Sequence, residues 1–352
     1  MEYANYIRRC IEIARRGEYY VAPNPMVGAV LVYNGERTNG ECILAEGWHE
    51  RYGEAHAEVN CFKSLPQSSL QGRSLKDCTL FVSLEPCSHY GKTPPCAKLL
   101  IEKGVGRVVV GMLDPNPLVA GKGVQMLRDA SIEVVVGVEE QACRELNKRF
   151  LCLHEQHRPY VVLKWAQTED GFVDRVRAYP QPLPKGKGVH LNGALAISTP
   201  ETKRLVHKMR AENMAIMVGT RTVLLDNPRL MNTHWEGRHP IRVTLDRHHV
   251  IPDDARIFSD GIETIVYRER TDWPFVLSDL AQRGIHSILV EGGPTLLHHI
   301  LETDIWDEMH IEVAPELRIG EGVPAPVIAL PDRYETVDGH RLYTILHAKK
   351  CK

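Results

Sequence analysis

Glu54-Ala55-His56-Ala57-Glu58, followed by Glu85-Pro86-Cys87 and then by Cys96, is the stretch that decides the fold and chemistry of the first half of this chain. One imidazole and two thiols can supply the three protein ligands of a catalytic zinc site, which leaves a fourth position for water. We therefore predict that His56, Cys87 and Cys96 bind one Zn²⁺ per chain. Bound zinc lowers the pKa of its water, and Glu58 can carry the proton from that water to a leaving amine.

The spacing of these residues is informative. An H-x-E segment followed by Pro-Cys and a second Cys is typical of zinc-dependent nucleobase deaminases. Their usual pattern has two residues between the cysteines, whereas Cys87-Ser-His-Tyr-Gly-Lys-Thr-Pro-Pro-Cys96 has eight. The alternative is a structural zinc clip, but such a site normally has four protein ligands and would leave Glu58 unexplained. The pattern favours a catalytic site.

Composition limits the class of protein. At 352 residues the chain is longer than a typical single domain, so we expect two domains. Hydrophobic residues make up 43% and charged residues 25%, as in ordinary globular proteins. A net charge of −2 argues against partners such as nucleic acid or an anionic membrane. No membrane span and no secretory signal are visible, and nine cysteines without a framework spacing suit a reducing cytosol. We expect a cytoplasmic protein.

The first half alternates helical and strand patterns. A helix is expected over residues 3–14, another from His56 to about Leu65, and a third that carries Cys96 in its first turn and ends near Gly104. Both metal-binding segments thus lie at helix starts, where the dipole favours thiolates. The remaining expected elements are strands at Val27 to Tyr33, Cys42 to Ala45, Thr79 to Leu84, Arg107 to Gly111 and Glu133 to Val138, a hairpin turn at Asn34-Gly35, and one last helix from Glu139 to about Glu155.

The second half begins after His157-Arg158-Pro159, which interrupts the pattern. It reads as another α/β unit with its own core. A loop rich in Pro, Gly and Lys is expected over 178–188. Strands are expected at Tyr160 to Ala166, Ala215 to Val218, Ile241 to Leu245, Thr264 to Tyr267 and Ser287 to Val290.

Longer motifs make the chain resemble, over essentially its whole length, the bifunctional deaminase–reductase family of riboflavin biosynthesis. The long spacer between the cysteines is a mark of that family. In the first half the resemblance rests on Asn24-Pro25-Met26-Val27-Gly28, Gly47-Trp48-His49, Ala55-His56-Ala57-Glu58-Val59, Glu85-Pro86-Cys87-Ser88-His89, Gly91 to Cys96 and Asp114 to Gly123. In the second half it rests on Lys164-Trp165-Ala166, Ser198-Thr199-Pro200, Arg210-Ala211, Val218 to Leu224, Asp226 to Leu230, Leu245-Asp246-Arg247 and Val290 to Leu297.

The resemblance implies an α/β fold in two parts. Residues 1–156 would form a cytidine-deaminase-like, three-layer domain, and residues 157–352 a dihydrofolate-reductase-like α/β domain. The first would deaminate 2,5-diamino-6-(5-phosphoribosylamino)pyrimidin-4(3H)-one with zinc. The second would use NADPH to reduce the ribosyl side chain of the product to ribityl. The expected partner is thus a small phosphorylated pyrimidine, and a homo-oligomer is compatible with a sequence that does not fix the oligomeric state.

The resemblance also implies site residues. The simpler interpretation is a turn residue for Asn24, Asp114, Asn116 and Asp226, and a solvated charge for Lys164, Arg210, Glu291 and Arg247. Those expected to contact substrate are Asn24, Asp114, Asn116, Lys164, Arg210, Leu230 and Glu291. Those expected to contact cofactor are Ala166, Ala196, Thr222, Asp226, Arg247, Gly293, Pro294, Thr295 and Leu296.

Two of these expectations also have a physical basis in the residues. Gly292-Gly293 lets the backbone approach a phosphate closely, and Thr295 opens a helix whose amino terminus can hold pyrophosphate. Arg247 follows an apolar strand, where α/β sheets bind nucleotides, and its guanidinium can grip a 2′-phosphate. His49 is open between a structural and a functional interpretation.

The chain departs from the family at two places in the second half. Ala194-Leu195-Ala196 stands where Ser-x-Trp is common, and Thr233 stands where an Arg is usual. Both positions normally help to hold cofactor or substrate phosphate. A deaminase with a degenerate, purely structural reductase domain is therefore one rival hypothesis. A nucleic-acid-editing deaminase and a zinc-stabilised binding module are two others; the long cysteine spacer and the net charge of −2 disfavour the editing enzyme.

Overall fold

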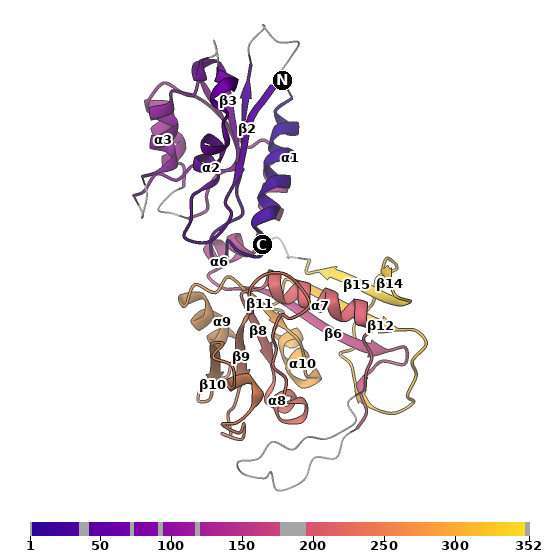
Figure 1. Ribbon diagram of the computed structural model, residues 1–352. Helices are drawn as coiled ribbons and strands as arrows, with labels where there is room; N and C mark the ends of the chain where they lie inside the picture. The colour runs from indigo at the N-terminus through magenta and orange to yellow at the C-terminus, as the bar shows by residue number, and fades with distance from the viewer. Residues whose placement is uncertain are drawn as a thin grey trace. The chain divides into compact units, whose positions relative to one another are not determined.

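The computed structural model describes residues 2–34, 42–70, 74–90, 94–116, 120–176 and 195–348. The chain divides into two compact units, Met1–Gln156 and His157–Lys352 (Figure 1). Several sequence features lie outside the described residues: Gly35 of the expected hairpin turn, parts of the quoted motifs at 91–93 and 117–119, the expected loop at 178–188, and Ala194.

The first unit is built on a five-stranded sheet in the order β2-β1-β3-β4-β5. Strand β1 (Gly28–Tyr33) pairs antiparallel with β2 (Cys42–Trp48) and with β3 (Cys78–Leu84). Strands β3, β4 (Arg107–Met112) and β5 (Glu133–Val136) run parallel. Every residue of β1 and β3 is buried, which explains why these strands read as continuous apolar runs rather than alternating ones.

Helices cover both faces of this sheet, as Figure 1 shows for α1 on one side and α2 and α3 on the other. On one face, apolar side chains of α2 (Ala57–Ser64), α3 (Cys96–Lys103) and α4 (Lys122–Asp129) share a core with the strands. On the other face the core includes α1 (Tyr3–Ala14), α5 (Glu140–Leu146) and α6 (Lys148–Gln156). The predicted three-layer α/β architecture is confirmed.

One expectation about this unit was wrong. The single last helix predicted from Glu139 to about Glu155 is two helices, α5 and α6, which are separated at Asn147. The Asn147 side chain accepts a hydrogen bond from the Met26 backbone N–H at 2.8 Å and donates one to the Met26 carbonyl at 3.0 Å. This tertiary pairing competes with the local helical pattern and breaks the helix there.

The second unit contains an eight-stranded sheet in the order β10-β9-β8-β11-β6-β12-β15-β14. The first six of these strands are parallel; at one edge β15 pairs antiparallel with β12, and β14 pairs antiparallel with β15. The strands are β6 (Tyr160–Thr168), β8 (Ala215–Val218), β9 (Ile241–Leu245), β10 (Thr264–Tyr267), β11 (Ser287–Val290), β12 (Glu308–Ala314), β14 (Glu335–Val337) and β15 (His340–Leu346). A separate pair joins β7 (Phe172–Asp174) to β13 (Val323–Pro324).

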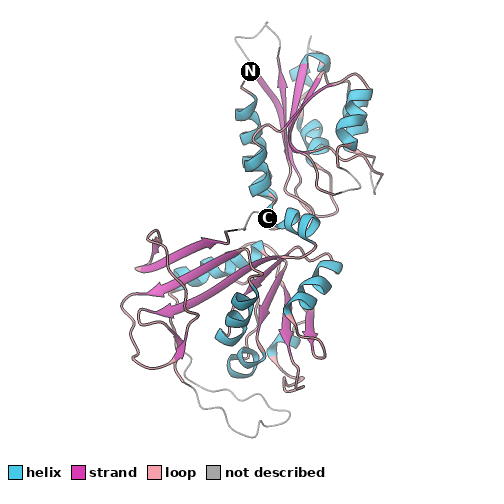
Figure 2. Ribbon diagram, turned by 180° about the vertical axis from the view of Figure 1, so that it is seen from behind, coloured by secondary structure: helices cyan, strands magenta, loops and turns pink. Residues whose placement is uncertain are grey.

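The four strands that follow β6 in the central sheet have the predicted bounds, but β7 and the strands after β11 were not predicted. Strand β12 was missed although its residues Glu308 to Val313 alternate between polar and apolar as a strand does; both of its glutamates are buried. Helices α9 (Trp273–Gln282) and α10 (Pro294–Thr303) share the main core with the sheet. Helices α7 (Pro200–Glu212) and α8 (Thr220–Asp226) complete this α/β unit, seen from behind in Figure 2.

Short 3₁₀ turns lie at Arg15–Gly17, Gln67–Leu70, Leu75–Asp77 and Arg256–Phe258. Among the described helices, none is both long and apolar enough to cross a membrane.

Candidate functional site

The three predicted zinc ligands meet in the first unit. His56 is the residue before α2, Cys87 follows β3, and Cys96 is the first residue of α3. Nδ1 of His56 lies 3.5 Å from Sγ of Cys87 and 3.4 Å from Sγ of Cys96. All three ligand atoms lie within 4.8 Å of one another. Residues 40 positions apart thus present one nitrogen and two sulfurs to a common point.

This arrangement fits Zn²⁺. Tetrahedral bonds of about 2.1 Å to nitrogen and about 2.3 Å to sulfur place the two ligand atoms roughly 3.6 Å apart. The observed separations of 3.4 and 3.5 Å agree with that value. The backbone N–H of Cys96 also donates to the Cys87 sulfur at 3.3 Å. Hydrogen bonds from Cys96, followed by that from His56, lower the pKa of the Cys87 thiol and favour the thiolate that binds metal.

Glu58 lies beside this cluster, in the first turn of α2. Its side chain is buried, with only 3% of the residue exposed. Burial, followed by the neighbouring Cys87, raises the pKa of Glu58 to about 7, and its carboxyl group also interacts with Cys96. The short interval between His56 and Glu58 therefore places a carboxyl group next to the metal-ligand atoms.

His49 is held in place by hydrogen bonds on both of its ring nitrogens. Its Nδ1 lies 3.0 Å from the Ala55 carbonyl oxygen, which can only accept, so Nδ1 carries the hydrogen. Its Nε2 then accepts from the Asn24 amide, 3.1 Å away. The residue is 3% exposed, and its ring packs edge-on against His56 at 5.6 Å. The bond to His49 takes one of the two hydrogens on the Asn24 amide nitrogen and so orients this side chain.

Glu85 supports the site although the sequence analysis gave it no role beyond its place in the Glu85-Pro86-Cys87 motif. Its buried carboxylate accepts backbone hydrogen bonds from Asp114 at 3.3 Å and Gly121 at 2.8 Å. Gly123 and Val124, in the first turn of α4, donate to its other oxygen at 2.9 and 3.2 Å. Glu85 thus ties together both ends of the segment that carries Asp114. The sequence feature that could have indicated this role is a Glu directly after a buried strand, combined with glycines at the start of a helix.

Asp114 and Asn116 form a turn next to this anchor. The Asp114 side chain accepts a hydrogen bond from the Asn116 backbone N–H at 2.8 Å, which is the simpler turn interpretation of these residues. Burial raises the pKa of the Asp114 carboxyl group, and charges at Glu85, His89 and Cys87 also act on it. The turn therefore lies within electrostatic reach of the zinc-ligand cluster.

Replacing the Glu85 carboxylate should loosen this part of the first unit. In Glu85→Gln an amide nitrogen would face backbone N–H groups that now donate to an oxygen. Hydrogen bonds to charged groups contribute roughly 1.5–3 kcal/mol each, and an unpaired buried donor costs about 1–3 kcal/mol. We expect the unfolding free energy of the first unit to fall by about 2–4 kcal/mol, as measured by denaturant unfolding. The exposed Glu102→Gln is the matched control, and an equal, small change in both variants would contradict this role.

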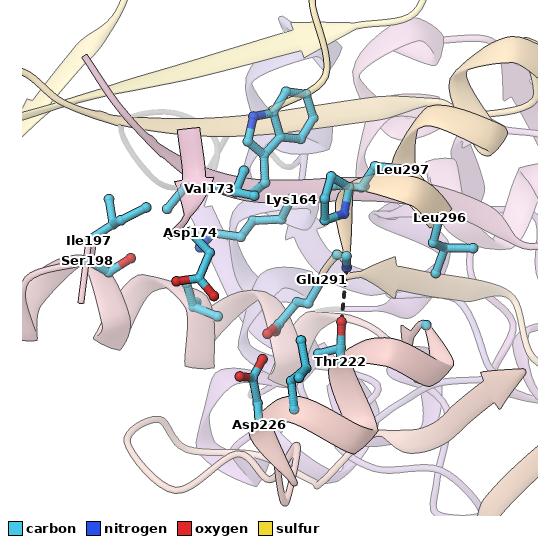
Figure 3. A pocket seen from close by; sticks show the side chains of 18 of the residues that line it. Lys164, Val173, Asp174, Ile197, Ser198, Thr222, Asp226, Glu291, Leu296 and Leu297 are labelled. Atoms are coloured by element: carbon cyan, nitrogen blue, oxygen red, sulfur yellow. Dashed lines mark hydrogen bonds between the residues drawn. The ribbon is translucent and has the colours of Figure 1, made fainter. Parts of the chain in front are cut away.

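The second unit contains a cavity of about 1610 Å³. It lies beyond the carboxyl ends of β8, β9 and β11, beside β6 and α7, the place where open α/β sheets bind ligands. Its volume exceeds the roughly 300–1000 Å³ of a pocket for one small ligand, so it has room for a dinucleotide and a substrate together. In Figure 3, Lys164 of β6, Glu291 after β11, and Thr222 and Asp226 of α8 surround this cavity.

Almost all the residues expected in the reductase site line this cavity. They are Lys164, Ala166, Ala196, Arg210, Thr222, Asp226, Arg247, Glu291, Gly293, Pro294, Thr295 and Leu296. Leu230 is not among the lining residues. It has a positive φ of 54° and packs in a small core with Val218 and Val223.

Several lining residues are hydrogen-bonded to one another. Both oxygens of Glu291 accept from the Arg210 guanidinium, at 2.7 and 2.6 Å, and Arg210 also donates to the Met231 carbonyl. Arg210 and Glu291 thus form a paired unit rather than two separate charges. Thr222 accepts from the Gly293 backbone N–H at 3.2 Å, the bond that Figure 3 marks with a dashed line, and so holds the glycine turn against α8.

The glycine turn fits a phosphate-bearing cofactor. Gly292 has a φ of 103°, and an added Cβ there would meet no atom of the described residues within 4 Å. The turn leads from β11 into α10, whose first residues, Pro294 to Leu296, line the cavity. Backbone can therefore approach a ligand closely where a helix amino terminus adds positive potential.

Arg247 lies two residues after the end of β9 and lines the same cavity. Its guanidinium donates to the Thr271 hydroxyl. Within the described part of the chain it forms no salt bridge, so its charge has no acidic partner there. Thr233, the departure from the family pattern, is exposed, and its backbone N–H donates to His207. Ala196, the other departure, is an exposed part of the cavity wall.

Comparisons with known proteins give a family match within each of the two units. The family model for the cytidine and deoxycytidylate deaminase zinc-binding region matches residues 1–112, and that for the RibD C-terminal domain matches residues 159–327. A riboflavin biosynthesis protein RibD of Aquifex aeolicus is 36% identical over 342 residues, which cover 91% of this chain and 88% of the relative. RibD of Escherichia coli is 34% identical over 347 residues, covering 89% and 87%.

Solved structures of the same family match this chain over nearly its full length. A diaminohydroxyphosphoribosylaminopyrimidine deaminase/5-amino-6-(5-phosphoribosylamino)uracil reductase from Thermotoga maritima has a TM-score of 0.81 and 34% identity, and 99% of each chain is covered. RibD from Acinetobacter baumannii has a TM-score of 0.82 and 29% identity, again with 99% coverage of both chains.

Fold, sites and relatives define the class: this protein is a zinc-dependent deaminase joined to an NADPH-dependent reductase. The hypothesis of a degenerate reductase domain finds no support. The chain belongs to the RibD family of riboflavin biosynthesis proteins.

Proposed function

We propose that His56, Cys87 and Cys96 are the zinc ligands of the deaminase and that Glu58 carries protons in its reaction. The convergence of one nitrogen and two sulfurs beside a buried carboxyl group is the observation that supports this most strongly. Zinc, when bound, would supply Lewis-acid activation of a water molecule. Glu58 would accept a proton from the attacking water and return it to the leaving amine, so that ammonia departs uncharged.

The substrate of this step would be 2,5-diamino-6-(5-phosphoribosylamino)pyrimidin-4(3H)-one. Asn24 would read the edge of the pyrimidine with its side-chain amide, which the bond to His49 orients through one of its two N–H hydrogens. Asp114 and Asn116 would hold the ribosyl phosphate portion. The Glu85 anchor supports this role because it fixes the turn that carries them near the metal ligands.

The reductase would then convert the ribosyl side chain of the deaminated product to ribityl. NADPH, when bound, would supply the hydride. The residues proposed to hold it are Ala166, Ala196, Thr222, Asp226, Arg247, Gly293, Pro294, Thr295 and Leu296. Lys164, Arg210 and Glu291 would contact the substrate; Lys164 can donate to its oxygens, while Arg210 acts together with Glu291. Leu230 would act through the loop that it anchors in the core.

Arg247 should decide the preference for NADPH over NADH. A guanidinium without an acidic partner in the described residues can bind the 2′-phosphate, which NADH lacks. Hydrogen bonds to charged groups contribute roughly 1.5–3 kcal/mol, so Arg247→Ala should lower kcat/KM for NADPH by ~10–150-fold and barely change that for NADH. Steady-state kinetics with both cofactors measures this. Arg270→Ala, an exposed arginine outside the cavity lining, is the control; equal losses for both cofactors would refute the role.

We assign the deaminase to residues 1–156 and the reductase to 157–352, in a protein that works in the cytosol, where thiols stay reduced. A fragment of residues 1–156 should bind zinc and leave NADPH unoxidised, because the three ligands and their supporting strands lie within it. Zinc analysis and circular dichroism check this. A fragment that folds without binding zinc would show that the second unit is needed for the site. A homo-oligomer is compatible with this assignment.

The direct test of the second step is a spectrophotometric NADPH assay on separately prepared deaminated substrate. Rapid oxidation of NADPH that depends on this substrate is the expected result. Normal deamination without any NADPH oxidation would instead favour a purely structural second domain.

A further inference from the structure

Lys164 is a nearly buried cation in the wall of the reductase cavity. It lies on β6, its side chain is 13% exposed, and it lines the cavity. Burial disfavours a charged ammonium, so a lysine here needs a counter-charge to remain protonated. Two carboxylates are near enough to provide one: Glu291 after β11 and Glu312 on β12.

Glu291 is already matched by another cation. Both of its oxygens accept from Arg210, at 2.7 and 2.6 Å. The positive charge of Arg210 also lowers the pKa of Lys164, and so it offsets the increase in this pKa that Glu291 causes. Among these four charged groups, Glu312 is the carboxylate left for Lys164.

Glu312 lies close enough to Lys164 to be its counter-ion, and neighbouring side chains hold its carboxylate in place. In the register of β6 and β12, Glu312 lies opposite Ala166, two residues from Lys164 and therefore on the same face of the sheet. Its carboxylate lies 3.9 Å from Nζ of Lys164 and is 2% exposed. Three further groups hold it: the hydroxyls of Ser198 at 2.6 Å and Thr202 at 2.7 Å, and Nδ1 of His340 at 2.8 Å.

The charge states follow from this packing. Burial lowers the pKa of Lys164, and Glu312 is the largest of the charges that oppose the shift. Burial alone would raise the pKa of Glu312, but Lys164 and the bonds from Ser198, Thr202 and His340 lower it overall. On β12, His310 lies opposite Lys164 in the register and is bonded to Glu308. The titratable side chains of β7 and α7 that line the cavity, besides Arg210, are Asp174, Glu201, Lys203, Arg204 and His207.

We infer that Glu312 is a positioning residue of the reductase: it keeps Lys164 protonated and fixed in the cavity wall, while Ser198, Thr202 and His340 hold the Glu312 carboxylate in place. This inference rests on the proposed contact between Lys164 and substrate. Reduction of the sugar adds a hydride to carbon and a proton to the attached heteroatom. A cationic lysine stabilises the negative charge that develops there, and only a protonated lysine can do so.

The test is the pH dependence of reductase kcat/KM in the full chain. Glu312→Gln keeps the shape of the side chain but removes its charge, so Lys164 should lose its proton at lower pH. We expect the alkaline fall in kcat/KM to begin at lower pH than in the parent protein. The loss should be at least about tenfold at pH 8.5 and clearly smaller at pH 6. Glu312→Asp keeps a carboxylate and should retain the parent profile, whatever its absolute rate.

Three readouts separate the explanations. Deaminase activity of the same variants should be unchanged, which shows that the first unit is folded, and the circular dichroism spectrum of the full chain should match that of the parent protein, which shows the same for the second unit. Lys164→Met should abolish reduction; if it does not, the proposed role of Lys164 fails, and the inference with it. If Lys164→Met is inactive but Glu312→Gln keeps the parent pH profile, the inference alone is overturned. The same holds if the Asp and Gln variants shift the profile equally.

A measurement on the parent protein covers the case in which Glu312→Gln does not fold. Lysine side chains labelled with ¹³C at the ε-carbon can be titrated by NMR, and the Lys164 signal identified by its absence in Lys164→Arg. The inference predicts an ammonium at Lys164 through pH 8. A neutral amine at pH 7 would overturn it.

Discussion

Glu58→Gln should retain zinc and lose deamination. The amide preserves the size of the buried side chain, and His56, Cys87 and Cys96 still offer their three ligand atoms. It cannot accept the proton of the attacking water, and loss of such a group typically lowers the rate by ~10²–10⁴-fold. Zinc content and the deamination rate, measured on the same sample, check this prediction.

Glu54→Gln is the matched control for Glu58→Gln. Glu54 lies in the same segment, but its side chain is 56% exposed and interacts with Arg51 at the surface. Its substitution should leave deamination nearly unchanged. Near-normal deamination by Glu58→Gln would remove Glu58 from the mechanism, while loss of zinc in that variant would make it a support for the metal site.

Cys87→Ser and Cys96→Ser should each lose zinc and with it deamination. A serine hydroxyl stays protonated near neutral pH and is a poor replacement for a thiolate ligand. Each substitution removes one of three ligands, so metal analysis should fall from about one zinc per chain to a small fraction. Reduction of separately supplied deaminated substrate should continue, because the reductase cavity is lined by residues of the second unit.

Cys42→Ser provides the control for the cysteine variants, since Cys42 is a free, half-buried cysteine of β2 outside the cluster. It should bind zinc as the parent protein does. Full zinc occupancy in both Cys87→Ser and Cys96→Ser would refute the ligand assignment.

The zinc cluster could be predicted from sequence because its chemistry is local. Each ligand lies at the start of a helix or just after a strand, and those elements were visible in the hydrophobic pattern. The type of ligand atom was not predictable, because which nitrogen of His56 faces the sulfurs depends on how α2 packs against the sheet. The role of Glu85 was hidden for a similar reason: its four partners are backbone N–H groups up to 39 residues away.

The second unit shows more clearly which features a local sequence pattern does not predict. Strands β8 to β11 were predicted because they are short and apolar, whereas β12, which alternates polar and apolar residues and carries two buried glutamates, was missed. Those charges are explained only by tertiary partners such as Lys164 and His340. The pairing of Arg210 with Glu291 and the break of the helix at Asn147 are likewise long-range contacts, and no local pattern contains them.

The central claim is that one chain performs two ordered reactions. Its most direct test is to incubate the zinc-loaded protein with the diaminopyrimidinone phosphate, with and without NADPH, and to determine product masses. Without NADPH, the expected product has exchanged one amine for oxygen and still carries a ribosyl group. With NADPH, it should also have gained two hydrogens as a ribityl group. Unchanged substrate in both reactions, or reduction that precedes loss of the amine, would contradict the account.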